Sequence, residues 1–167
     1  MEEGAREYLF ENLKIKQDSI FDFEELYQRL FSWFEVMGYD FYEKGYEKHE
    51  QGGADNLKIF WEATKKASDY TKFTIEVNFF ILGISKVYIE KEGLKIKTNK
   101  CNMEIRMSAY LIKDVGDKMK KSVGNFGRKV YERYIARERM EDNEIQLYKE
   151  THLLLDEIKG FTSMHTF

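Results

Sequence analysis

The sequence predicts an α+β protein in which an antiparallel sheet of about six strands packs against helices from both ends of the chain. Three observations support this fold class. A helical pattern of apolar residues covers residues 23–37, apolar and polar residues alternate with a period of two through much of residues 39–112, and a helical pattern returns after Val115. Closely spaced strands joined by short turns are typical of antiparallel pairing.

The helix at residues 23–37 has clear signals at both ends. Asp22 with Glu25 three residues later forms a capping-box pattern, and Gly38 stands where a helix ends. Between these ends the apolar side chains recur at helical spacing: Phe23, Leu26, Tyr27, Leu30, Phe31, Phe34 and Met37. Before this helix, residues 13–16 alternate between apolar residues and lysine, as expected of a half-buried strand.

The strands of the sheet are predicted from alternation and from turn residues. The expected segments are 39–48, 57–64, 71–81, 87–90, 94–97 and 102–112. Turn-like residues at 91–93 and at 98–100 separate the last three segments. Because every second position in these segments is polar, we expect one face of the sheet to be solvated.

The C-terminal third is predicted to be a long helix with a kink or break near residues 140–143. On a helical wheel, the apolar side chains of 123–134 and those of 147–158 lie on clearly different sides. A straight helix cannot bury both stripes against one sheet, so we expect a change of direction between them. Residues 144–167 would then form a distal helix extending from the domain.

Composition predicts one domain that spans residues 1–167. With 43% apolar and 16% aromatic residues the chain is not of the disordered class, and 34% charged residues exclude an integral membrane protein. No apolar run reaches the roughly 18–20 residues that a membrane span needs. Glu2 and Glu3 stand where a secretory signal carries positive charge, and Cys101 has no cysteine to pair with, so a cytoplasmic location is expected.

Charge is distributed unevenly along the chain. The net charge is −3, yet residues 118–139 carry eight basic and two acidic side chains. In the predicted helix 128–139, Lys129, Arg133 and Arg137 form a basic file with one helical turn between neighbours. Arginine beside tyrosine can stack on bases, clamp phosphates or contact lipid headgroups. The alternative is that these side chains surround a packed tyrosine stripe and pair with acidic residues of the first fifty.

The sequence contains no catalytic or cofactor motif. Its three histidines are scattered, and no Walker A loop, dinucleotide fingerprint or serine elbow occurs, so neither an enzyme nor a cofactor is predicted. On a regular strand Glu43, Glu47 and His49 point the same way, but Glu43 and Glu47 would lie roughly 13 Å apart. His152 and Asp156 stand one helical turn apart, and two ligands do not make a site. No metal site is predicted.

The order of elements resembles the helix-grip arrangement of the START and pollen-allergen superfamily, in which a curved sheet wraps a long C-terminal helix. The resemblance rests on the segments 13–16, 23–37, 39–112 and the helix after Val115, and it departs from that superfamily in having one helix, where two are common, after the first strand. A cystatin-like or NTF2-like roll is the alternative. The phrases GYDFYEKGYEK and LKIFWEATKKASDYTKF also resemble a prokaryotic or archaeal family of unknown activity.

The helix-grip resemblance implies a cavity between sheet and helix that takes an apolar ligand. The first functional hypothesis is therefore a non-enzymatic binding domain for an apolar or amphipathic small molecule. Its expected lining residues are Trp61, Phe73, Phe79, Tyr131 and Tyr134, although large aromatic side chains can also fill such a space themselves. The alternative is an accessory or structural protein that docks through helix 128–139 onto RNA or another anionic partner, or that forms a homodimer through residues 144–158.

Overall fold

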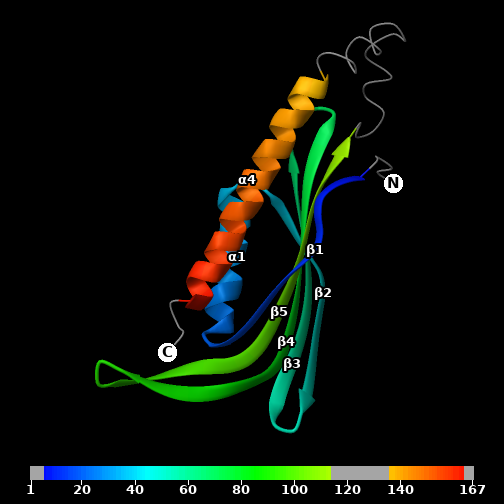
Figure 1. The fold of residues 1–167 in the computed structure, drawn as a ribbon. Coiled ribbons are helices and arrows are strands. Elements are labelled where there is room, and N and C mark those ends of the chain that lie inside the picture. The colour runs from blue at the N-terminus through cyan, green and yellow to red at the C-terminus, as the bar shows by residue number, and fades with distance from the viewer. Residues whose placement is uncertain (1–5, 114–135, 164–167) are drawn as a thin grey trace, which may run out of the picture.

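The computed structural model describes residues 6–113 and 136–163, which form one five-stranded sheet and two helices (Figure 1). The elements in chain order are β1 (Arg6–Ile20), α1 (Phe23–Val36), β2 (Asp40–Gln51), β3 (Ala54–Lys66), β4 (Thr71–Lys91), β5 (Leu94–Lys113) and α4 (Ala136–Ser163). The predicted α+β class, with an antiparallel sheet and a C-terminal helix packed on it, is confirmed.

The strand order is β1-β5-β4-β3-β2, and every neighbouring pair is antiparallel. Strands β2 to β5 follow one another as a meander, whereas β1 pairs with the last strand, β5. The two edges of the sheet are therefore β1 and β2. Both helices lie on the same face of the sheet, with α4 running alongside α1 (Figure 1).

The sheet has five strands where about six were predicted, because the short segments 87–90 and 94–97 are the far ends of β4 and β5. The predicted turn at 98–100 is wrong: Thr98 pairs with Val87 and Lys100 pairs with Ser85 in an unbroken β5. Polar residues at 98–100 suit a turn, but they suit equally the solvated positions of a strand. The turn near 91–93 is confirmed, and Glu92 and Gly93 there both have positive φ angles of 53° and 77°. That pair of angles is typical of a two-residue hairpin.

Helix α1 begins where the capping pattern predicts. The side chain of Asp22 accepts hydrogen bonds from the backbone N–H groups of Glu24 and Glu25, at 3.0 and 3.2 Å. The helical stripe buries Phe23, Leu26, Leu30 and Phe34 against the sheet. This apolar face holds α1 on the sheet, because tertiary packing supplies most of the stability of a short helix.

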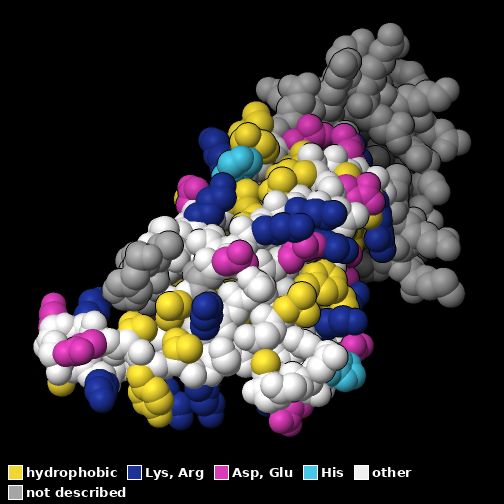
Figure 2. All heavy atoms as spheres, turned by 60° about the horizontal axis from the view of Figure 1, so that its bottom comes forward, with side chains coloured by type: hydrophobic (Ala, Val, Ile, Leu, Met, Phe, Trp, Pro, Cys, Tyr) yellow, Lys and Arg dark blue, Asp and Glu magenta, His cyan; other side chains and the backbone are white. Residues whose placement is uncertain are grey.

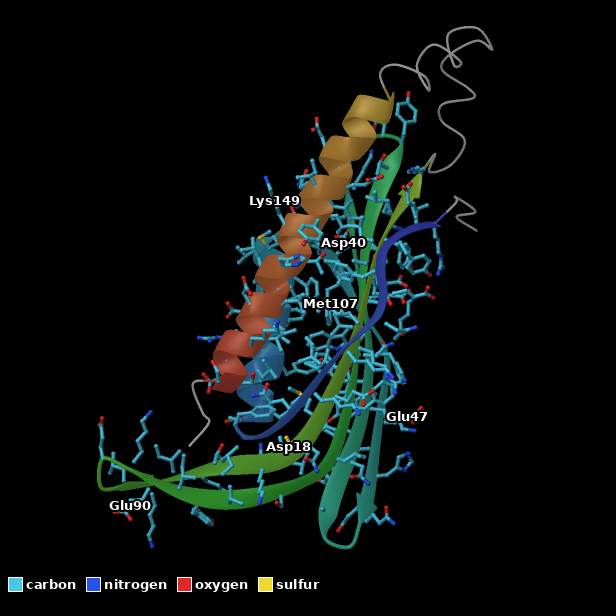
Figure 3. The ribbon with its side chains drawn as sticks, viewed as in Figure 1. Asp18, Asp40, Glu47, Glu90, Met107 and Lys149 are labelled. Carbon is cyan, nitrogen blue, oxygen red and sulfur yellow. The ribbon has the colours of Figure 1, made fainter. Side chains whose placement is uncertain are left out.

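The hydrophobic core lies between the sheet and the two helices. Alternate residues of β3, β4 and β5 point inward, and their side chains are almost completely buried. The inward-facing residues of these strands include Ile59, Trp61, Ala63, Phe73, Ile75, Val77, Phe79, Ile81, Met103, Ile105, Met107, Ala109 and Leu111. The side chains of these strands and of the helices fill the layer between them, where Met107 lies (Figure 3).

Helix α4 is continuous from Ala136 to Ser163, so the predicted break near residues 140–143 is wrong. That prediction compared a stripe at 123–134 with a stripe at 147–158, and the first of these lies outside the described residues. Within the described part of α4 one apolar stripe suffices. It buries Leu147, Leu154, Leu155, Ile158 and Phe161. No helix among the described residues is long and apolar enough to cross a membrane.

The opposite face of the sheet carries polar and charged side chains mixed with aromatic ones. Arg106 donates to Glu104 at 2.6 Å and lies over the ring of Phe80, 4.8 Å from its centroid. Tyr110 donates to Glu76 at 2.9 Å, and the guanidinium of Arg6 lies over the Tyr110 ring. These contacts cover aromatic rings without a third layer of secondary structure among the described elements.

Candidate functional site

The described residues predicted to line a ligand cavity are packed in the core. Trp61 and Phe79 are in edge-to-face contact with ring centroids 4.7 Å apart, and Tyr27 and Phe41 each approach Trp61 at 4.8 Å. Phe73 is fully buried near the start of β4. Side-chain rings thus surround Trp61. Tyr131 and Tyr134 lie outside the described residues, so the cavity between sheet and helix stays a prediction.

The predicted basic file also falls mostly outside the described residues. Lys129 and Arg133 precede the described part of α4, and Arg137 lies in its first turn, where only the backbone is described. Docking of RNA or another anionic partner on helix 128–139 therefore stays a prediction.

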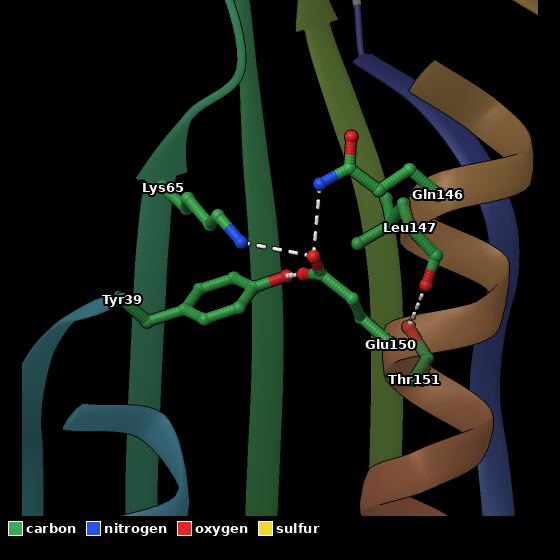
Figure 4. A network of polar contacts seen from close by, with 6 residues as sticks. All are labelled: Tyr39, Lys65, Gln146, Leu147, Glu150 and Thr151. Carbon is green, nitrogen blue, oxygen red and sulfur yellow. Dashed lines mark hydrogen bonds and ion pairs between the residues drawn. The ribbon is translucent and has the colours of Figure 1, made fainter. Parts of the chain in front are cut away.

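A cluster of polar side chains is buried between α4 and the sheet (Figure 4). At its centre lies Glu150 of α4, which is only 7% exposed. Its carboxylate accepts hydrogen bonds from Tyr39 Oη at 2.6 Å, from Lys65 Nζ at 2.9 Å and from Gln146 Nε2 at 3.0 Å. The ammonium of Lys65 also lies 5.2 Å from the centroid of the Tyr39 ring. Three segments of the chain meet here: the residue before β2, the end of β3, and α4.

The electrostatics of this cluster favour a charged carboxylate. Burial alone would raise the pKa of Glu150, but the hydrogen bonds from Lys65, Tyr39 and Gln146 outweigh it and hold this pKa below its ordinary value. Burial and the neighbouring carboxylate raise the pKa of Tyr39 far above the ordinary tyrosine value. Because the carboxylate is charged and bonded by three donors, the cluster is a clamp between α4 and the sheet.

The acidic residues of β2 do not gather into a metal site. A bulge between Glu43 and Gly45 breaks the alternation, so Glu43 pairs with Trp61 on the helix-covered face while Glu47 pairs with Lys58 on the other. The Glu43 carboxylate accepts hydrogen bonds from Tyr27 Oη and from Trp61 Nε1. Burial, together with Glu43, raises the pKa of Tyr27 to about 12. Among the described residues, no three His, Cys, Asp or Glu side chains lie close enough to hold a metal ion.

Cys101 lies buried in β5, where Ser19 of β1 is opposite it. Burial, with a smaller contribution from the negative charge of Asp18, raises the pKa of its thiol to about 11. The thiol therefore stays protonated near neutral pH, which makes it a poor nucleophile.

The feature that sequence patterns did not reveal is a long hairpin that extends from the sheet. We call residues 85–100, the far ends of β4 and β5 with their turn, the arm. Pairing of β3 with β4 ends at Asp55 and Ile84, and pairing of β1 with β5 ends at Ile20 and Lys100. Beyond these points the arm is a two-stranded ribbon that curves away from the body of the protein (Figure 1).

An irregularity of the ladder marks the base of the arm. The register of β4 and β5 shifts between Leu82 and Ser85, and Gly83 has a φ of 65°. The N–H of Gly83 donates to the side-chain oxygen of Asn56 at 2.9 Å. An extra residue in one strand bends it and increases the local twist, which explains why the arm leaves the plane of the sheet here.

The two faces of the arm differ in chemistry, because directly paired residues share a face. One face, here the apolar face, carries Val87, Ile89, Leu94 and Ile96. The other, here the charged face, carries Lys86, Tyr88, Glu90, Lys95 and Lys97. The side chains of Leu94, Ile96 and Tyr88 are 68%, 41% and 69% exposed. Figure 2 shows hydrophobic and basic side chains next to each other at this end of the molecule.

The arm is basic in a protein that is acidic overall. It contains five lysines and two glutamates, whereas the whole chain has a net charge of −3. None of these lysines makes an ion pair with another residue in the part of the chain that the structure describes. An open hollow of about 340 Å³ lies near the tip of the arm, lined by Tyr88, Ile89, Glu90 and Lys95.

Comparisons with known proteins do not add to this description. No family model, no curated protein and no solved structure matches the chain.

Proposed function

We propose that this protein is a non-enzymatic docking protein whose arm binds an acidic protein partner. The observation that carries the proposal is the arm itself: a basic, two-faced ribbon with apolar side chains exposed and no neighbouring strand on either side among the described elements. An isolated two-stranded hairpin is marginally stable in water, and a third strand or a packed face stabilises it. A partner would supply both.

An acidic protein segment matches all three properties of the arm. Its carboxylates would neutralise lysines that lack ion pairs with described residues, and its apolar side chains would cover Leu94 and Ile96. Its backbone would also satisfy the outward N–H and C=O groups of the ribbon. Exposed strand edges are sites at which proteins add a further strand.

Nucleic acid fits the arm less well. Double-stranded DNA carries about one negative charge per 1.7 Å of axis, so its binding depends on clusters of basic groups free of acidic neighbours. Glu90 lies on the charged face of the arm, and Asp18 lies beside the base of the arm (Figure 3). Asp22 follows Phe21, whose N–H donates to the carbonyl of Asn99 at the same place. These carboxylates would repel the continuous row of phosphates of a duplex, whereas an alternating segment needs to place its acidic residues only beside Lys95 and Lys97.

A lipid bilayer also fits less well. The interior of a membrane offers no hydrogen-bond partner to the open edges of a ribbon, and each unsatisfied backbone group there costs several kcal/mol. The apolar face is also narrow, with four apolar side chains and a lysine at each end, Lys91 and Lys100.

The experiment compares three labelled probes on the full chain: a short peptide that alternates glutamate and valine, a DNA duplex, and vesicles containing phosphatidylserine. We expect the peptide to bind, to dissociate as salt rises, and to bind about a hundredfold more weakly to the Lys95→Glu/Lys97→Glu variant, since each lost ion pair contributes roughly 0.2–1 kcal/mol and each new repulsion a similar amount at both positions. A matched control is Lys14→Glu/Lys16→Glu, which changes the net charge equally on β1. Binding of DNA or vesicles without binding of the peptide would overturn the proposal.

A further inference from the structure

The arm has two open edges, and they are not equivalent. On the β5 side, β1 pairs with β5 from Ile112 to Lys100. The N–H of Phe21 then donates to the carbonyl of Asn99 at 2.9 Å, and the chain turns into α1 at Phe23. Strand β5 continues to Leu94 without β1. Among the described elements, no strand therefore pairs with residues 94–98 of β5 on the edge that pairs with β1 farther along the strand.

Backbone groups of β5 are unpaired along this edge. In an extended strand the N–H and C=O of one residue point to the same edge, and successive residues alternate between the two edges. Since the carbonyl of Asn99 faces the β1 side, the backbone groups of Lys97 and Lys95 face it as well. Those of Ile96 and Thr98 face β4. The open edge thus offers the donors and acceptors of two residues, in line with the ladder that β1 already uses.

The side chains on the two sides of this unpaired edge determine which kind of segment can bind there. Leu94 and Ile96, the most exposed residues of the apolar face, lie on one side of the sheet plane. Lys95 and Lys97 lie on the other. An added strand places alternate residues on these two sides, so a matching segment has apolar residues beside Ile96 and acidic residues beside the lysines.

The β4 edge of the arm matches such a segment less well. Its charged side carries Glu90 between Tyr88 and the tip, which would repel an acidic residue placed opposite. The bulge at Gly83 also interrupts this edge at the base of the arm, whereas β5 has no irregularity there. The β5 edge has no such interruption, and it carries Lys95 and Lys97 on one side of the sheet plane and Leu94 and Ile96 on the other.

We infer that the partner binds as an added β-strand of alternating apolar and acidic residues along residues 94–98 of β5, on the edge where pairing with β1 stops at Phe21. The open stretch spans about five residues, or roughly 17 Å at 3.3 Å per residue. This inference rests on the proposed function, because it states how the arm holds an acidic protein segment. Main-chain hydrogen bonds then supply affinity, and the two rows of side chains supply selectivity.

The test is residue-resolved amide hydrogen exchange of the full chain, measured with and without the peptide that alternates glutamate and valine. We expect the peptide to slow exchange at the amides of Lys95 and Lys97. Exchange at Tyr88 and Glu90, whose backbone groups face the β4 edge, should not change. Protection at Tyr88 and Glu90 instead would overturn the inference, because the partner would then use the other edge.

Two matched pairs of reagents separate strand addition from simple charge attraction. Lys97→Glu and Lys86→Glu change the net charge of the arm equally, but only Lys97 flanks the β5 edge. We expect about a tenfold loss of peptide affinity for Lys97→Glu, and a loss of less than about threefold for Lys86→Glu, which lies beside the other edge. A peptide methylated on alternate backbone nitrogens keeps its charges but cannot donate to the ladder. We expect its affinity to fall at least about tenfold, since each lost hydrogen bond contributes roughly 0.5–1.5 kcal/mol.

Failure of this inference can be told apart from failure of the proposed function. If the methylated peptide binds as well as the unmethylated one and no amide of the arm is protected, the arm attracts acidic segments by charge, and strand addition is wrong. If the unmethylated peptide does not bind, or binds equally to the Lys95→Glu/Lys97→Glu variant, both the docking function and the added strand are wrong.

Discussion

Replacing Glu150 with glutamine tests whether the buried cluster clamps α4 to the sheet. The carboxylate accepts three hydrogen bonds at 2.6, 2.9 and 3.0 Å, from Tyr39, Lys65 and Gln146. Removing one partner of a fully buried ion pair costs roughly 3–5 kcal/mol. The side chain of Lys65 is 22% exposed, so water can hydrate its ammonium in the variant. We therefore expect Glu150→Gln to lower the free energy of unfolding by about 2–3 kcal/mol.

Urea unfolding across a pH series measures this loss and its electrostatic origin. The folded-state pKa of Glu150 lies below the ordinary 4.5, so its stabilising charge is fully present above pH 4.5 and is lost as the pH falls through the lowered pKa. The variant lacks this titration. The gap between wild type and Glu150→Gln should therefore be constant near neutral pH and shrink well below pH 4.5.

The matched control is Glu157→Gln, the same change on the same helix. Glu157 pairs with Arg29 at 3.5 Å, and both side chains are more than a third exposed. Surface pairs of this kind contribute roughly 0–1 kcal/mol, so the control should stay near wild type. If Glu150→Gln is no less stable than Glu157→Gln, or if the gap persists unchanged at low pH, the clamp is not electrostatic.

Two further predictions concern local geometry. Gly93→Ala puts an L side chain at a φ of 77°, which costs about 1–2 kcal/mol, so amides of the arm should exchange faster while the global unfolding midpoint stays the same. Gly160 lies inside α4, and an added Cβ there would contact no atom outside the helix within 4 Å, so Gly160→Ala should stabilise the protein by up to about 1 kcal/mol in thermal unfolding. If both substitutions stabilise the structure, or both destabilise it, the backbone argument is wrong. Cys101 is buried with a thiol pKa of about 11, so iodoacetamide should label it only after denaturation, and rapid labelling of the folded protein would show that the thiol is not buried in the core.

Local signals in the sequence predicted the elements that depend on local physics. The capping residue Asp22 and the stripe behind it predicted α1 to within a residue or two, and alternation predicted which residues of β3, β4 and β5 face the core. The length of β4 and β5 was missed. Whether Thr98 forms a turn or continues a strand depends on a partner eleven residues earlier, Val87, and not on its own neighbours.

The buried clamp was missed for a related reason. Glu150 stands three residues after Leu147 and four before Leu154, within the apolar stripe of α4, and a carboxylate in such a position is a signal of a buried partner. The partners themselves, Tyr39 and Lys65, are 111 and 85 residues away along the chain. No local pattern identifies them. The bulge at Glu43 was likewise hidden, because one extra residue in a strand changes which face each later side chain occupies.

The bend at Gly83 separates the residues of β4 and β5 that stabilise the core from those that form the arm. The inward-facing core side chains of β4 and β5 end at Ile81 and Cys101, so most arm residues contribute little to the stability of the domain. The arm can then open and close as a unit of its own, at a lower free energy than global unfolding. If the arm binds a partner as proposed, substitutions at Leu94 to Lys97 can change which segment it binds without repacking the core. On that proposal, the sequence of the binding surface is free to diverge faster than the sequence that specifies the fold.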